Sequence, residues 1–264
     1  MDQKQSNTLC EKDQKSIEGE KMNIYRKTAI SVGVLFLIAL FFNIIASNIY
    51  QPILNAPDYL VKVYPNKLPV TIGILLDFIC APAMILIPIM LFPLFKMFNE
   101  RIALGYVAFR LLEGILFIFL AINSLSLISL SQDYINSGAP GVSYFQALGN
   151  SIHARIEWAT LLYIIVYTLG AFMFYYLLYT SKLIPRWLSG WGFFADVILL
   201  TGAVLHMFGI FGTMPLMKVM PYFAPPIGLQ EIVMAIWLIV KGFNPSAIEL
   251  SLSATPSTSG GRMG

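Results

Sequence analysis

Charged side chains are the scarcest feature of this sequence. Only 12% of its 264 residues are charged, whereas 57% are hydrophobic. A soluble domain carries about 25% charged residues. The chain therefore has too few polar side chains to cover a water-exposed surface, which excludes an ordinary soluble protein and indicates an integral membrane protein. The net charge is only +3, and the basic residues lie between apolar runs, so we expect no nucleic-acid partner.

Cysteine and histidine are also rare, with two of each. Cys10 lies in a polar stretch and Cys80 in an apolar run, so no disulfide framework is predicted. Two histidines are too few for a histidine-rich metal cluster, and the sequence contains no H-E-x-x-H motif. Ser151 lies in GNSIH, which is not a G-x-S-x-G nucleophile motif. The sequence therefore identifies no catalytic residue, metal or cofactor.

Long apolar runs are what the chain does contain. We predict a disordered polar tail over residues 1–23, a membrane domain over 24–245 and a flexible Ser/Thr/Gly-rich tail over 246–264. A spanning helix needs about 20 apolar residues, with about 17 as the lower limit. The membrane domain contains six such runs: Ala29–Asn48, Pro69–Phe95, Ile102–Leu130, Trp158–Tyr179, Leu188–Phe211 and Ala224–Val240. Backbone in lipid must satisfy its own hydrogen bonds, so we predict an all-α bundle of six transmembrane helices.

The positions of lysine and arginine predict the orientation. One side of the predicted bundle carries Lys15, Lys21, Arg26, Lys27, Lys96, Arg101, Lys182, Arg186 and Lys241. The other side carries Lys62, Lys67, Arg155 and Lys218. Because loops rich in Lys and Arg stay in the cytoplasm, both termini are predicted to be cytoplasmic.

Ionisable residues inside these runs are the candidate functional residues. The acids are Asp77, Glu113, Glu157, Asp196 and Glu231, and the basic residues are Arg110, Arg155 and His206. A charge at the bilayer centre costs about 2.5–3.5 kcal/mol on insertion scales, so such residues normally face the bundle interior. Because acids outnumber bases, either some acid is protonated or a bound cation supplies the missing charge.

Arg110 and Glu113, in the stretch FRLLEG, form the first candidate group with Asp196. Residues three apart are neighbours on a helix, so Glu113 can neutralise Arg110. We expect Asp196 to share Arg110 from another helix, giving an intramembrane charge network. One interpretation is that this network fixes how the helices pack. The other is a binding or proton-handling site.

Asp77, Glu157, His206 and Glu231 form the second candidate group, in the outer half of four different helices. Arg155 is two residues from Glu157, about 200° around a helix, so it cannot share that face. If the four side chains converge on one cavity open to the outside, they suit a cation, either a divalent metal or a protonated amine, or the acids keep their own protons with raised pKa values. The alternative is that they never meet, because the order of helices around the bundle is not encoded in the pattern.

Two classes of function fit these observations. The favoured class is a non-enzymatic membrane protein, either a small transporter or a modulator that binds lipid or a partner protein. The alternative is an intramembrane enzyme acting on a lipid or lipid-linked substrate from the outer leaflet. Membrane lipids are the expected surroundings, a cation or an amine is the expected ligand, and no protein partner is identified.

Four segments carry a resemblance to a known family. They are RKTAISVGVLFLIA (26–39), FRLLEG (109–114), LIPRWLSGWG (183–192) and AIWLIVKGFNP (235–245). With them the chain, over about residues 24–245, resembles a bacterial multi-pass membrane family catalogued as domain of unknown function 4386. The resemblance implies a helical bundle in the bacterial cytoplasmic (plasma) membrane, and it implies no substrate, cofactor or catalytic residue.

Overall fold

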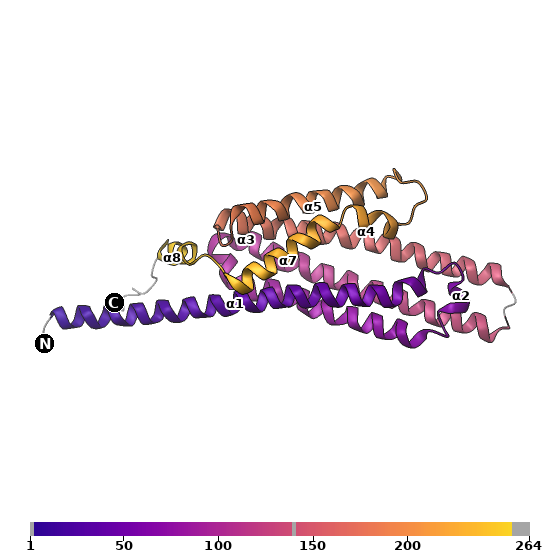
Figure 1. Ribbon diagram of the computed structural model, residues 1–264, viewed down its shortest axis with the longest axis horizontal. Helices are drawn as coiled ribbons and strands as arrows, with labels where there is room; N and C mark the ends of the chain where they lie inside the picture. Colours follow the sequence, from indigo (N-terminus) through magenta and orange to yellow (C-terminus); the bar gives the residue numbers. More distant parts are fainter. Residues whose placement is uncertain (1–2, 139–140, 255–264) are drawn as a thin grey trace, which may run out of the picture.

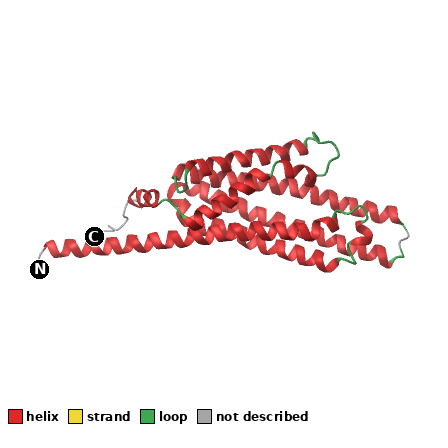
Figure 2. Ribbon diagram, viewed as in Figure 1, coloured by secondary structure: helices red, strands yellow, loops and turns green. Residues whose placement is uncertain are grey.

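Helices make up the whole architecture of the described residues. The computed structural model describes residues 3–138 and 141–254. The helices are α1 (Gln3–Leu54), α2 (Tyr59–Lys62), α3 (Lys67–Asn136), α4 (Val142–Ser181), α5 (Arg186–Met207), α6 (Leu216–Val219), the 3₁₀ turn η1 (Met220–Tyr222), α7 (Pro225–Val240) and α8 (Pro245–Ala254). The long helices pack side by side in an elongated bundle (Figures 1 and 2). Each of the six predicted apolar runs coincides with a helix or helical segment, except that the fifth extends past the end of α5 and the sixth begins one residue before α7.

Helix α3 is a hairpin of two helical segments. Asn99 has non-helical backbone angles (φ −159°, ψ 102°), and its side-chain oxygen accepts a hydrogen bond from the Ile102 N–H at 3.1 Å. This is the geometry of a helix N-cap, so Asn99 starts the second segment. A Cβ placed on Gly114 would lie 3.1 Å from Ile85 Cδ1. In a straight helix these residues would be roughly 43 Å apart, at 1.5 Å per residue, so the second segment folds back along the first.

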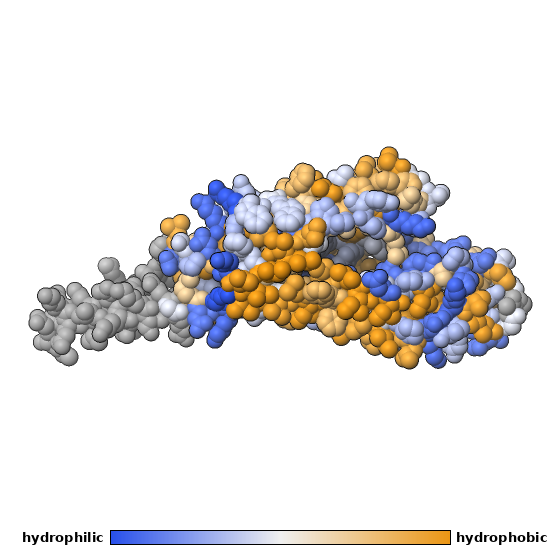
Figure 3. All heavy atoms as spheres, viewed as in Figure 1, coloured by the Kyte–Doolittle hydropathy of each residue, from blue (hydrophilic) through white to orange (hydrophobic). Residues whose placement is uncertain are grey.

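Four helices are long and apolar enough to cross a membrane: Met22–Leu54, Lys67–Asn136, Val142–Ser181 and Arg186–Met207. A fifth candidate is the pair Leu216–Tyr222 and Pro225–Val240, which is bent by 58°. Figure 3 shows the corresponding hydrophobic band, with hydrophilic residues gathered at both ends. The residues that the structure describes therefore form an all-helical integral membrane protein.

Helices α1 and α7 are held together at one end of the bundle. The Arg26 guanidinium donates hydrogen bonds to the carbonyl oxygens of Leu238 (3.1 Å), Ile239 (2.7 Å) and Val240 (3.1 Å). These are the last carbonyls of α7, where a positive charge is favoured by the helix dipole. Nearby, a Cβ on Gly33 would lie 2.7 Å from the Ala235 oxygen, so the missing side chain lets the two backbones approach closely.

Parts of both predicted tails lie in helices. Helix α1 begins at Gln3, so residues 3–23 form the first part of this helix. This stretch is rich in Gln, Glu and Lys, all of which have high helix propensity. At the other end, residues 246–254 belong to α8, because Ile248 is buried in the main hydrophobic core. Residues 255–264 lie outside the described residues.

The main core lies between α1, α3, α4, α5 and α7. Its fully buried side chains include Phe95, Tyr106, Phe174 and Tyr175, which stack and tilt against one another. A smaller core joins α2 to the end of α3 through Leu60, Leu127 and neighbouring residues. The candidate site lies in the space between these two clusters.

Candidate ligand cavity

A cavity of about 580 Å³ extends into the bundle between α1, α3, α4, α5, α6 and α7. This volume is in the range of small-molecule sites, about 300–1,000 Å³. Most of its wall is apolar or aromatic, but four charged side chains contribute to it: Asp77, Arg110, Glu157 and Glu231. The site thus combines an apolar chamber with a few fixed polar groups.

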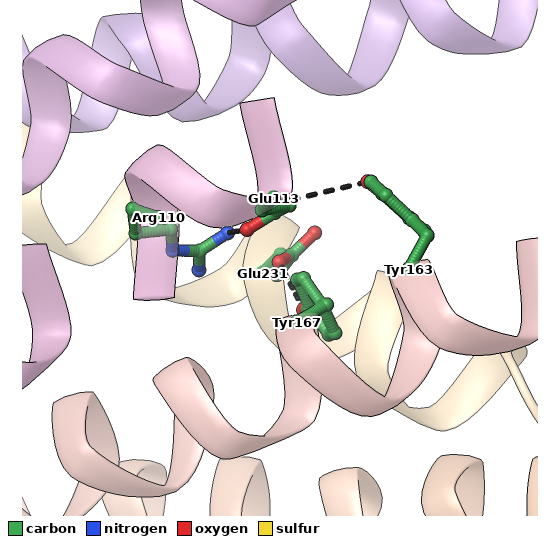
Figure 4. Close-up of polar contacts among 5 residues, drawn as sticks. All are labelled: Arg110, Glu113, Tyr163, Tyr167 and Glu231. Carbon is green, nitrogen blue, oxygen red and sulfur yellow. Dashed lines mark hydrogen bonds and ion pairs between the residues drawn. The ribbon is translucent and has the colours of Figure 1, made fainter. Parts of the chain in front are cut away.

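Arg110 and Glu113 form a buried ion pair in the second segment of α3. Arg110 Nη1 lies 2.9 Å from Glu113 Oε2, and the two residues are only 6% and 1% exposed. The Tyr163 hydroxyl, from α4, donates a hydrogen bond to the other carboxylate oxygen of Glu113 at 3.1 Å. Figure 4 shows the Arg110 guanidinium and the Tyr163 hydroxyl approaching Glu113 from two sides. The ion pair therefore joins two residues of α3, and a hydrogen bond connects it to α4.

Glu231 on α7 lies beside this pair. The Tyr167 hydroxyl donates a hydrogen bond to Glu231 Oε1 at 2.8 Å, and the Arg110 guanidinium lies 5.0 Å from the centre of the Tyr167 ring. Figure 4 shows Glu231 and Tyr167 next to Arg110 and Glu113. Arg110 thus meets an aromatic face and has electrostatic contact with two carboxylates, Glu113 and Glu231. Together the three charged groups carry one net negative charge when both acids are ionised.

Asp196 is placed differently from the network that the sequence predicts. It is fully buried in α5, and neither of its carboxylate oxygens has a hydrogen-bond partner among the described residues. It interacts electrostatically with Arg110 without reaching hydrogen-bonding distance. The structure therefore brings Arg110 and Glu113 together directly and leaves Asp196 nearby but unpaired.

Asp77 is held by two neutral donors from α1. Asn43 Nδ2 donates to Asp77 Oδ1 at 2.9 Å, and the Tyr50 hydroxyl donates to Asp77 Oδ2 at 2.9 Å. All three side chains line the cavity. Asn43 and Tyr50 were not predicted from the sequence, although their spacing of seven residues places them on one face of a helix. Their polar side chains on one helix face were the only local signal, and this signal does not identify Asp77 as their partner.

Glu157 marks the end of the cavity near α6. Its Oε1 lies 3.0 Å from His206 Nε2 and accepts a hydrogen bond from the Leu216 backbone N–H at 3.1 Å. Arg155 points elsewhere: its guanidinium donates to the Asn123 side chain at 3.1 Å and to Ser151 at 3.4 Å. Three members of the second predicted group line one cavity: Asp77, Glu157 and Glu231. The fourth, His206, does not line the cavity but contacts Glu157.

These three carboxylates have no lysine or arginine within ion-pair distance in the described part of the chain. Their hydrogen-bond donors are amide, hydroxyl, imidazole and backbone groups. Residues 3–138 and 141–254 contain no group of three or more His, Cys, Asp or Glu side chains that could hold a metal ion. The site therefore offers separate carboxylates around an apolar space.

The family model described as domain of unknown function DUF4386 matches residues 31–242, which is most of the chain. The chain belongs to the DUF4386 family. This confirms the resemblance found in the sequence. No significant match was found among curated proteins or among solved structures.

The match places the whole cavity inside the DUF4386 domain. All of its charged residues, from Asp77 to Glu231, fall within residues 31–242. Helix α8 and residues 3–30 of α1 lie outside the matched range. The family description assigns no activity, so the function of this DUF4386 protein has to be argued from the cavity.

Proposed function

We propose that this DUF4386 protein binds an amphipathic molecule carrying a positively charged amine, and that it does so inside the membrane as a small transporter or a lipid-binding modulator. The observation that carries this proposal is the cavity of about 580 Å³ with three carboxylates, none of which has a lysine or arginine of the described residues within ion-pair distance. A carboxylate in an apolar site is stabilised by a bound cation. The apolar and aromatic wall suits the rest of such a ligand.

The mouth of the cavity supports entry from the membrane. Helices α1 and α7 touch at the Arg26 end, and α7 then diverges from α1 along its length (Figure 1). The far end is closed by Asn55, directly after α1, whose side chain donates to Met217 Sδ of α6 at 3.2 Å. The cavity reaches Asn55 and Met217, both exposed, at that end. Figure 3 shows a hollow on this face beside the hydrophobic surface. A ligand dissolved in the bilayer can therefore reach the carboxylates without first crossing the membrane.

A probe series tests this proposal. We expect the purified protein to bind a single-chain alkyl amine saturably, with one molecule per chain counted by native mass spectrometry. The fatty acid and the alcohol of the same chain length should bind much more weakly, because they have the same apolar body and lack the positive charge. Equal binding of the acid or the alcohol, or no saturable binding of the amine, would contradict the proposal.

Our proposed topology has six spans with both termini in the cytoplasm, counting the α3 hairpin as two spans and the bent α6–α7 pair as one. The fold supports it in one respect, since the start of α1 and helix α8 leave the bundle at the same end (Figure 1). Reporter fusions at Asn136 and Pro221 should read external, and a fusion at Ser181 should read cytoplasmic. An external reading at Ser181 would overturn this topology.

A further inference from the structure

A second pocket, of about 490 Å³, lies where the α4–α5 turn meets the α7–α8 turn. It is lined by residues 182–186, Trp237 and residues 241–245. Three of these side chains are basic (Lys182, Arg186 and Lys241), and none of the lining residues is acidic. This pocket is separate from the central cavity and shares no lining residue with it.

The backbone holds the two turns together. The Asn244 N–H donates to the Leu183 carbonyl at 2.9 Å, and the Asn244 side chain donates to the Lys182 carbonyl at 3.4 Å. Lys182 itself has φ 57°, the left-handed conformation that normally favours Gly or Asn at the end of a helix. A lysine there accepts backbone strain, which is a common feature of binding sites. The basic side chains are therefore anchored around one hollow by a defined backbone.

The electrostatics of the pocket favour an anion. Arg186 is the first residue of α5, where the helix dipole is positive, and the first turn of α5 contains no acidic residue. Lys182, Arg186 and Lys241 are all exposed, and no ion pair involves them in the part of the chain that the structure describes. Lys182 and Lys241 follow the C-termini of α4 and α7, which favour a cation, and Arg186 begins α5. The hollow between them carries a net positive charge, which suits a bound anion.

The position of the pocket indicates where that anion comes from. The apolar run of α5 begins at Leu188, two residues after Arg186, and Trp187 between them is 57% exposed. Exposed tryptophan beside a basic residue at the end of an apolar run is typical of the lipid headgroup region. Trp237 adds an aromatic wall to the pocket. Figure 3 shows hydrophilic residues gathered at this end of the hydrophobic band, near α8.

We propose that this pocket binds a phosphate group, carried by an anionic phospholipid of the leaflet in contact with the Lys182 end of the bundle. Lys182, Arg186 and Lys241 contact the phosphate oxygens, and Trp237 packs against the apolar part of the lipid. The inference requires the membrane placement of the helices and does not depend on the ligand of the central cavity. A soluble phosphate compound has the same chemistry, so the experiment must distinguish the two sources.

The test uses the full chain in detergent and measures binding of phosphatidylglycerol and phosphatidylcholine by native mass spectrometry. We expect the wild type to prefer phosphatidylglycerol. In the triple variant Lys182→Gln/Arg186→Gln/Lys241→Gln this preference should fall on the order of a hundredfold, because each basic residue contributes about 1 kcal/mol to binding an anionic lipid. A matched control, Lys62→Gln/Lys67→Gln/Lys218→Gln, removes the same charge at the other end of the bundle and should keep the preference. A charge-retaining variant, Lys182→Arg/Arg186→Lys/Lys241→Arg, should also keep most of it.

Competition with inorganic phosphate distinguishes a phospholipid ligand from a soluble phosphate compound. If millimolar phosphate leaves lipid binding unchanged, the pocket selects the lipid, as we propose. If phosphate displaces the lipid in the wild type, the phosphate site is upheld and its ligand is soluble. The proposed site would be wrong if the wild type showed no preference for phosphatidylglycerol. It would also be wrong if the matched control lost this preference as much as the triple variant. Neither result bears on amine binding in the central cavity, so the two proposals can fail separately.

Discussion

Arg110→Ala is expected to lower the free energy of unfolding by about 3–5 kcal/mol, the usual cost of removing one partner of a buried ion pair. Glu113 is 1% exposed and would keep only the Tyr163 hydrogen bond. Its negative charge would then be buried without a cation at hydrogen-bonding distance. Unfolding in mixed micelles by titration with sodium dodecyl sulfate, followed by far-UV circular dichroism, measures the change.

The double variant Arg110→Ala/Glu113→Ala should be more stable than Arg110→Ala alone, because it leaves neither member of the pair stranded. Arg101→Ala is the matched control: Arg101 is exposed near the start of the same α3 segment, so its loss should change stability by less than about 0.5 kcal/mol. If the double variant loses as much stability as the two single variants added together, Arg110 and Glu113 are not coupled.

Gly192→Ala is expected to destabilise the protein by about 1–3 kcal/mol through overpacking. A Cβ at Gly192 would lie within 2.2 Å of the Tyr175 ring, which is buried between α4 and α5. Moving that ring would also weaken the hydrogen bond from the Tyr175 hydroxyl to Gln230 Oε1, now 2.7 Å. Gln230 Nε2 in turn donates to the Leu188 carbonyl at 3.2 Å, so one methyl group disturbs contacts among three helices. The same micelle titration gives the size of the effect.

Gly190→Ala provides the control for this substitution. Gly190 lies on the same helix, two residues away, and a Cβ there would meet no atom within 4 Å. Replacing it should leave stability unchanged or raise it by up to about 1 kcal/mol, because alanine favours the helix. Equal destabilisation by both variants would show that the close contact between Gly192 and Tyr175 is not what the substitution disturbs.

The sequence was sufficient for features that depend on one helix alone. Membrane burial requires long apolar helices, so the six runs could be located from the order of apolar residues alone. The pairing of Arg110 with Glu113 was also predictable, because residues three apart on a helix must be neighbours. In both cases the geometry is fixed by local backbone structure.

Contacts between helices could not be predicted in the same way. Apolar runs of similar composition can be arranged around a bundle in many orders. The spacing of Asn43 and Tyr50 placed them on one face of their helix, but it could not indicate that this face meets Asp77. Nor could the pattern of apolar residues reveal that Asp196 makes no hydrogen bond to Arg110. Helix α8 was missed because its composition is Ser-rich, while its helix depends on burying Ile248 against the core.

The central claim is that carboxylates in the cavity hold the positive charge of an amphipathic ligand. The most direct measurement is the affinity of the alkyl amine for the wild type and for the double variant Asp77→Asn/Glu231→Gln, each reconstituted in phosphatidylcholine nanodiscs. We expect the variant to bind roughly thirtyfold more weakly or worse, because losing a buried charge partner costs about 2 kcal/mol or more. The matched control Asp133→Asn/Glu100→Gln, which changes two exposed acids, should bind like the wild type. Unchanged affinity in the Asp77→Asn/Glu231→Gln protein, with its fold intact by circular dichroism, would contradict the account.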